Sequence, residues 1–192
     1  MNNRKVYISG EIVPEADAKI SIFDSAVLLG DTVTESTRTF NYKPFKLDDH
    51  LERLYKSFKL TRIDPQMTIE EMKKVSLELL EINKDNYKAN EDCWLVHNIS
   101  RGHSITGGNP ALQVSKPTVM IYTQPMNLVL WAPFYTKGCH AVTPPTRMVP
   151  SQSLDARIKN RSRLFYTLAE IEAKLVDPDA QSVILDIHGN VA

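Results

Sequence analysis

The sequence predicts a two-domain α+β protein, and three features of the chain carry this prediction. In its N-terminal part, short runs of strand-forming residues alternate with turn residues, and two amphipathic helical patterns follow. A stretch with two prolines and no clear periodicity comes next, and a strand, helix, strand pattern lies beyond it. We expect an N-terminal α+β domain over residues 1–123, an interdomain linker over 124–137 and the first part of a C-terminal domain over 138–192.

The opening forty-odd residues predict an antiparallel meander. Short apolar runs over 6–8, 12–13 and 18–23 are separated by turn residues. The run over 31–40 is rich in Val and Thr, which favour strands, and a turn over 41–44 closes it.

A helix is expected directly after this meander. Asp49 can cap it, and Glu52 three residues later completes a capping-box pattern. His50, Arg53 and Ser57 share one flank, and periodicity alone favours a solvent-exposed Arg53. A different stripe, at i, i+3, i+4 and i+7, is apolar and is expected to face the core: Leu51, Leu54, Tyr55 and Phe58.

The remaining elements follow from the same patterns. A second helix is predicted over 68–84, and strands are predicted over 93–99 and 117–123. Glycines and a proline indicate a loop over 101–110 between these two strands.

The last part of the chain predicts a strand over 139–143, a helix over 164–176 and a strand over 182–187. His-Gly-Asn over 188–190 is a good hairpin turn, and only two residues of the return arm follow it. Because two residues do not complete a hairpin, we expect the C-terminal domain to be incomplete in this chain.

Composition excludes several classes of protein. Lys plus Arg and Asp plus Glu number 23 each, so the chain lacks the basic excess typical of nucleic-acid binders. The two cysteines, Cys93 and Cys139, are far apart and predict neither a disulfide framework nor a metal site. No signal-peptide pattern and no apolar stretch of about 20 residues is present, so we expect a cytoplasmic protein with no membrane partner.

Lys159 lies in a basic run, RIKNRSR over 157–163, directly before the helix expected at 164. Lysine amines form Schiff bases with carbonyl groups, including the aldehyde of pyridoxal phosphate (PLP). Taken alone, however, four alternating cations favour a solvated surface ridge.

Five motifs in order carry a resemblance to a known family. They are FD and LGDTVTE within 23–35, PF and LDDHLERL within 44–54, SRG at 100–102, IKN at 158–160, and ILD with GNVA within 184–192. On these residues the chain resembles the class IV, fold-type IV PLP-dependent aminotransferases. This family includes branched-chain and D-amino acid aminotransferases, R-selective amine transaminases and aminodeoxychorismate lyase.

The resemblance implies a first α+β domain, a second domain built on a barrel-like sheet, and PLP between them. Lys159 would hold PLP as a Schiff base, and its freed amine would move a proton between the substrate and the cofactor. Arg53 would bind the PLP phosphate, because a planar guanidinium donates two parallel hydrogen bonds. Thr34 would face the substrate, and Arg101 would lie near the active-site wall in a carboxylate-binding or, as we favour, a structural role.

The chain departs from the family pattern at several positions. Thr34 stands where the family commonly has Phe or Tyr. Leu164, five residues after the lysine, replaces the tyrosine of branched-chain enzymes, as in the D-amino acid and lyase branches, and Tyr166 is out of register. The glutamate that pairs with the PLP pyridine nitrogen would follow Ala192.

The resemblance therefore implies an aminotransferase that exchanges an amino group between an amino acid, branched-chain favoured, and a 2-oxo acid. One alternative is a lyase or a D-amino acid or amine transaminase of the same family. The other is a non-catalytic, truncated chain. The family also implies a homodimer.

Overall fold

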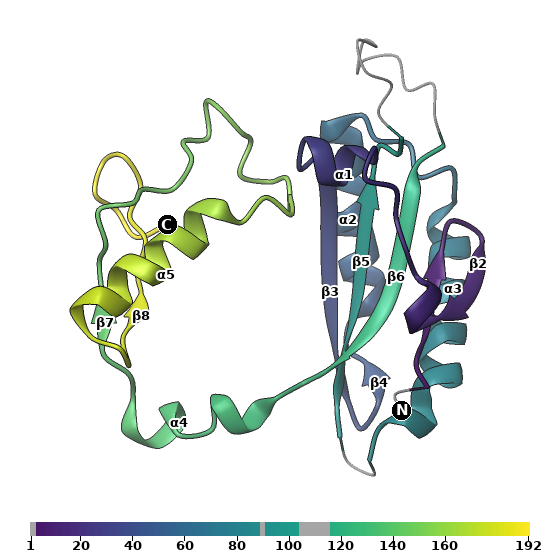
Figure 1. Cartoon of the computed structure of the whole chain (residues 1–192), viewed down its shortest axis with the longest axis horizontal. Coiled ribbons are helices and arrows are strands. Elements are labelled where there is room, and N and C mark those ends of the chain that lie inside the picture. The colour runs from purple at the N-terminus through teal and green to yellow at the C-terminus, as the bar shows by residue number, and fades with distance from the viewer. Residues whose placement is uncertain (1–2, 89–90, 104–115) are drawn as a thin grey trace. The chain divides into compact units, whose positions relative to one another are not determined.

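The computed structural model describes residues 3–88, 91–103 and 116–192, and the chain forms two compact units (Figure 1). Unit 1 comprises Met1–Met126 together with Ile158–Arg161, and unit 2 comprises Asn127–Arg157 and Ser162–Ala192. The segment that contains Lys159 therefore groups with the N-terminal part of the chain. The linker and domain bounds expected from the sequence stay predictions.

The elements of the chain have the following bounds: β1 Lys5–Ile8, β2 Glu11–Pro14, η1 Glu15–Asp17, α1 Ser25–Leu28, β3 Thr32–Phe40, β4 Lys43–Pro44, α2 Leu47–Thr61, α3 Ile69–Asn83, η2 Lys84–Asn86, β5 Cys93–Ser100, β6 Thr118–Pro125, η3 Leu128–Leu130, α4 Phe134–Lys137, β7 Ala141–Val142, α5 Leu164–Val176 and β8 Gln181–Ser182.

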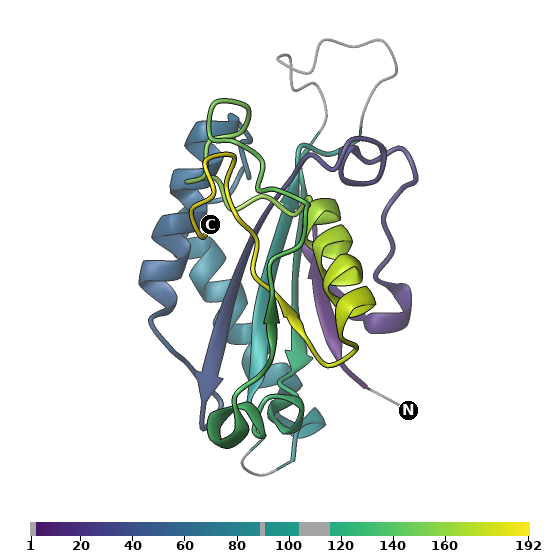
Figure 2. The same ribbon diagram turned by 90° about the vertical axis from the view of Figure 1, so that its left-hand side faces the viewer.

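Unit 1 is a six-stranded antiparallel sheet with the order β2-β1-β6-β5-β3-β4. Helices α2 and α3 cover one face of it (Figures 1 and 2). Their apolar side chains pack with those of the central strands in a single core, and the stripe expected on the first helix is confirmed: Leu51, Leu54 and Phe58 are buried and Tyr55 is partly buried.

The expected meander is wrong. Strands β1 and β2 form a hairpin, but β6 and β5 separate β1 from β3. The predicted strand over 18–23 is absent as well. In a meander this segment would pair with the outer edge of β2, but the chain passes from β2 into the short helix η1, and residues 18–23 do not join the sheet. Two of the apolar side chains in the segment, Ile22 and Phe23, are exposed.

The capping box predicted at Asp49 and Glu52 is also wrong. Helix α2 begins earlier, at Leu47, after Lys46 in the left-handed region with φ of 52° and no side-chain cap. The capping box of this protein lies at the start of α3, where Thr68 accepts from the Glu71 backbone and the Glu71 carboxylate accepts from the backbone of Thr68.

Unit 2 contains α5, whose bounds match the predicted helix, and a two-stranded parallel sheet of β7 and β8. The strands expected over 139–143 and 182–187 are therefore shorter than predicted. The predicted turn is present: Gly189 has φ of 89°, and the Asp186 carboxylate accepts from the backbone of His188 and Asn190. Among the described helices, none has both the length and the apolar character needed to cross a membrane.

Candidate active site

The backbone around Lys159 lies along the outer edge of β3. The N–H of Thr34 donates to the Lys159 carbonyl at 2.8 Å, and the N–H of Arg161 donates to the Thr32 carbonyl at 2.9 Å. On the other side, the N–H of Lys159 donates to Ser57 Oγ of α2 at 3.3 Å. Three hydrogen bonds of the main chain thus fix the position of Lys159 relative to β3 and α2.

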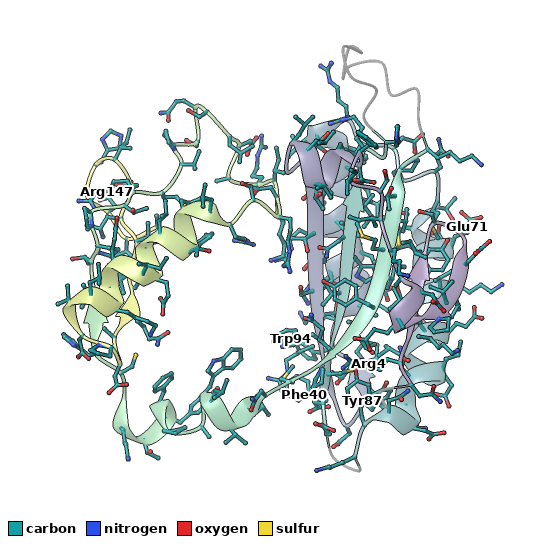
Figure 3. The ribbon with its side chains drawn as sticks, in the orientation of Figure 1. Arg4, Phe40, Glu71, Tyr87, Trp94 and Arg147 are labelled. Atoms are coloured by element: carbon teal, nitrogen blue, oxygen red, sulfur yellow. The ribbon has the colours of Figure 1, made fainter. Side chains whose placement is uncertain are left out.

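This pairing uses only the start of β3. At the other end of the strand, Thr39 and Phe40 pair with β4. Figure 3 shows Phe40 and Trp94 at that distant end of the sheet. Between the two edge partners, the N–H of Ser36 donates to the carboxylate of Glu35 at 2.9 Å instead of to a neighbouring strand.

Arg53 lies on α2 and forms a two-pronged ion pair with Glu35 of β3. Arg53 Nε donates to Glu35 Oε2 at 2.7 Å, and Arg53 Nη2 donates to Glu35 Oε1 at 2.7 Å. The Glu35 side chain is fully buried, whereas 53% of the Arg53 side chain is exposed. The fork uses two of the five N–H donors of the guanidinium, so others remain for a second acceptor.

The surroundings keep Glu35 ionised. Burial raises the pKa of Glu35, but hydrogen bonds from Arg53, the Ser36 backbone and His50 outweigh it and leave the pKa below its usual value. His50 Nδ1 lies 3.1 Å from Glu35 Oε1. Reciprocally, the hydrogen bond to Glu35 raises the pKa of Arg53.

Helix and strand periodicity bring these groups together. His50, Arg53 and Ser57 lie at i, i+3 and i+7, so they share one flank of α2, and this flank faces the start of β3. Glu35 lies on the helix-covered face of β3, since its carboxylate contacts two side chains of α2, and the residues on either side of it point to the opposite face. Arg53 and Ser57 are one turn apart, about 6 Å along the helix axis.

Thr34 and Arg101, the other two residues predicted for the site, are engaged within unit 1. Thr34 is buried and its Oγ1 donates to the His97 carbonyl at 3.0 Å. Arg101 pairs with Asp31, with Nε at 2.7 Å from Oδ2, and also donates to the carbonyls of Thr61 and Arg62 at the end of α2. The roles predicted for Thr34 and Arg101 stay predictions.

Sequence reasoning missed three residues of this site: Glu35, His50 and Ser57. The signal was present in the polar flank of the first helix, although periodicity alone could not tell a flank facing solvent from one facing a strand edge. Glu35 was visible only as part of a motif, because its partner depends on how β3 is placed against α2.

A small hollow lies on the sheet face opposite α2 and α3. Its volume is about 210 Å³. Thr32, Asn98 and Arg161 line it, together with apolar and small residues of unit 1. Thr32 and Arg161 are also joined by the hydrogen bond that fixes the Lys159 segment. A cation and two polar side chains thus border a space beside the lysine's backbone.

The donor set of this site fits PLP. A primary amine is the group that an aldehyde needs, and a guanidinium with remaining donors is the group that a phosphate needs. Helix α2 carries the guanidinium on Arg53 and, one turn later, holds the backbone of Lys159 through Ser57. In the described part of the chain, no cluster of three or more His, Cys, Asp or Glu side chains is placed to hold a metal ion.

The chain is similar to known proteins over most of its length. The family model for amino-transferase class IV matches residues 32–192. A Methanocaldococcus jannaschii protein, provisionally named a branched-chain-amino-acid aminotransferase, is 35% identical over 187 residues, which are 97% of this chain and 61% of that protein. A Staphylococcus epidermidis D-alanine aminotransferase is 32% identical over 120 residues, 62% of this chain and 41% of that protein.

Solved structures give the same result for the fold. The branched-chain aminotransferase of Thermoproteus uzoniensis with norvaline has a TM-score of 0.77 at 25% identity, covering 98% of this chain and 62% of that one. The branched-chain amino acid aminotransferase of Escherichia coli has a TM-score of 0.80 at 22% identity, covering 99% of this chain and 60% of that one. The chain spans about 61% of the length of the M. jannaschii relative. The predicted fold class is confirmed.

A lysine and an arginine held together by one helix, a family model that matches most of the chain, and a shared fold lead to one conclusion: this chain belongs to the class IV aminotransferase family.

Proposed function

We propose that this chain carries the PLP-binding lysine of an aminotransferase that exchanges an amino group between an amino acid and a 2-oxo acid. The observation that supports the proposal best is the joint placement of Lys159 and Arg53. The backbone of Lys159 is hydrogen-bonded to Ser57, one helical turn from Arg53, and a phosphate-binding arginine beside an amine is what PLP requires.

Each residue has a separate task in this proposal. Lys159 would hold the cofactor through its amine Nζ and would act as the general base and acid that moves a proton between the substrate Cα and the cofactor. Arg53 binds the phosphate and so fixes the distance from the phosphate to the amine. PLP, when bound, supplies the electron sink for the substrate.

Branched-chain amino acids are the substrates that we favour. A relative that matches 97% of this chain carries a branched-chain name, and so do two solved structures of the same fold. The D-alanine aminotransferase relative supports a second candidate, transamination of D-amino acids, because Leu164 and Thr34 depart from the branched-chain pattern. The lyase of the same family and a chain without activity remain the other two outcomes of the test below.

The test is the visible absorbance band that PLP gives when it is bound covalently to a lysine. We expect the band in the wild-type protein and its loss in Lys159→Ala, with aminotransferase activity falling by about 10²–10⁴-fold or more. Lys74→Ala, at an exposed position on α3, is the matched control and should keep the band. Borohydride reduction and peptide mapping should locate the label at Lys159.

The products then separate the candidates. Exchange of branched-chain or D-amino acids with a 2-oxo acid distinguishes the two transaminase candidates, and aminobenzoate with pyruvate would identify the lyase. A wild-type protein that develops no band after incubation with PLP would overturn the proposal. By family resemblance we also propose a homodimer.

A further inference from the structure

Behind Arg53 lies a carboxylate with no exposed surface. Glu35 contributes 0% of its side chain to the surface, yet it is ionised and accepts hydrogen bonds at both oxygens. Taking a carboxylate out of water is costly, and it is tolerated only when hydrogen bonds from charged or backbone donors replace the water. Glu35 meets this condition through Arg53, His50 and the N–H of Ser36.

The charge of the Arg53 guanidinium does not need Glu35 as a counterion. The Arg53 side chain is half exposed, so water could solvate the guanidinium without Glu35. What the fork provides is orientation. Two hydrogen bonds of 2.7 Å to one carboxylate fix both the plane and the rotation of a guanidinium that ends a long, flexible side chain.

The position of Glu35 is fixed by contacts other than the one with Arg53. It lies in β3, where its position is set by pairing with His97 of β5. The Ser36 N–H and His50 Nδ1 converge on the same oxygen, Oε1, that receives Arg53 Nη2. These contacts hold the carboxylate in one position, so the orientation of the Arg53 guanidinium is determined by β3.

We propose that Glu35 is the positioning residue of the phosphate site: it does not touch the cofactor, and it aims the remaining donors of Arg53 at the phosphate. This inference rests on the function proposed above, in which Arg53 binds PLP through its phosphate. It assigns a task to a residue that otherwise reads as one member of a buried ion pair.

The experiment compares two ligands that differ only in the phosphate, PLP and pyridoxal. Dissociation constants for both are measured by titration of the wild-type protein, Glu35→Gln and Glu35→Asp. Loss of an orienting partner behind a ligand-binding side chain costs about 10–100-fold in affinity at metal sites, and we expect a loss of about tenfold or more for PLP in Glu35→Gln. The pyridoxal affinity should be unchanged. Glu35→Asp, which keeps the charge but not the reach, should fall in between.

Two further measurements exclude a general loss of structure. Glu52→Gln, an exposed carboxylate on the same helix that pairs with Lys56, should leave both affinities unchanged. In an Arg53→Ala background, Glu35→Gln should cause no further loss of PLP affinity, because the residue that Glu35 orients is gone.

The outcomes separate this inference from the proposed function. If the wild-type protein forms no covalent complex with either aldehyde, the proposed function fails. If the wild-type protein binds both, and Glu35→Gln weakens PLP and pyridoxal equally or weakens neither, the proposed function stands and Glu35 is not the positioning residue. A loss confined to PLP supports the inference, and the intermediate behaviour of Glu35→Asp tests it should Glu35→Gln fail to fold.

Discussion

The Glu35 carboxylate connects two parts of unit 1: its own strand, through the Ser36 N–H, and α2, through Arg53 and His50. Removal of this group would leave Arg53 without its fork and the Ser36 N–H without its acceptor. The same contacts also make the carboxylate sensitive to protonation, because a protonated acid accepts fewer charge-assisted hydrogen bonds.

The stability of the protein should therefore depend on pH through Glu35. The folded-state pKa of Glu35 is lowered, so its ionised form stabilises the fold above the unfolded pKa, about 4.3, and this contribution disappears as the pH falls through the folded-state pKa. We expect the difference in unfolding free energy between wild type and Glu35→Gln to be largest near neutral pH and to shrink below about pH 4.5. Urea unfolding at a series of pH values measures it, and a difference that stays constant across the range would contradict the prediction.

At the residue scale, the sequence indicated which residues to expect in the site, but it did not indicate which groups they contact. Family motifs pointed to Lys159 and Arg53. They could not pair Lys159 with Ser57, which lies 102 positions away, because that contact depends on the fold of everything between them. The side-chain contacts of Thr34 and Arg101 were beyond sequence reasoning for the same reason.

Among the elements, the two long helices of unit 1 were predicted correctly, but the N-terminal cap of one of them was not. Both long helices of unit 1 exist where periodicity indicated. The cap of α2 was misplaced because Lys46 enters the helix in a left-handed conformation that no propensity rule predicts for lysine. The capping box of α3, in contrast, uses side-chain contacts between residues that are close in sequence.

A pair of substitutions tests this difference. Thr68→Ala removes the cap of α3 and should lower the unfolding free energy by about 1 kcal/mol. Asp49→Ala should have little effect, because Asp49 is exposed and its ion pair with Lys46, at 3.4 Å, is a surface one. Thermal or urea unfolding of both variants measures the change, and equal losses would contradict the assignment of the caps.

Strand order was the element-scale failure. The sequence pattern identified five of the six strands of the main sheet, namely β1, β2, β3, β5 and β6. Pairing, however, is a long-range property, and β6 and β5 lie between β1 and β3. Strand propensity over 18–23 produced no strand, because propensity alone does not decide whether a segment pairs with the sheet.

In the whole molecule, the two units differ in how well they bury apolar side chains. Unit 1 has a continuous core, whereas apolar side chains along α5 of unit 2 remain exposed: Leu164, Leu168, Ile171, Leu175 and Val176. The chain also spans only about 61% of the M. jannaschii relative that it matches over 97% of its own length. Contiguous exposed apolar surface of this kind favours association.

We expect the 192-residue chain to self-associate through this face. Leu175→Lys, at a side chain that is 82% exposed, should reduce association without loss of stability. Leu77→Lys is the matched control, because Leu77 is an exposed leucine of α3 in unit 1, at 42% exposure. Light scattering measures the mass of each variant, and a monomeric wild-type chain would contradict the prediction.

The pairing of Ile158–Arg161 with β3 also has a consequence for the order in which the protein is made. A chain that leaves the ribosome from its N-terminus can form the sheet and both long helices of unit 1 before residue 158 has been synthesised. The contact between Ser57 and Lys159 closes a loop of 102 residues, so its entropic cost is met only after those elements exist. Lys159 therefore reaches the edge of β3 late in folding, after β3 with Glu35 and α2 with Arg53 have formed.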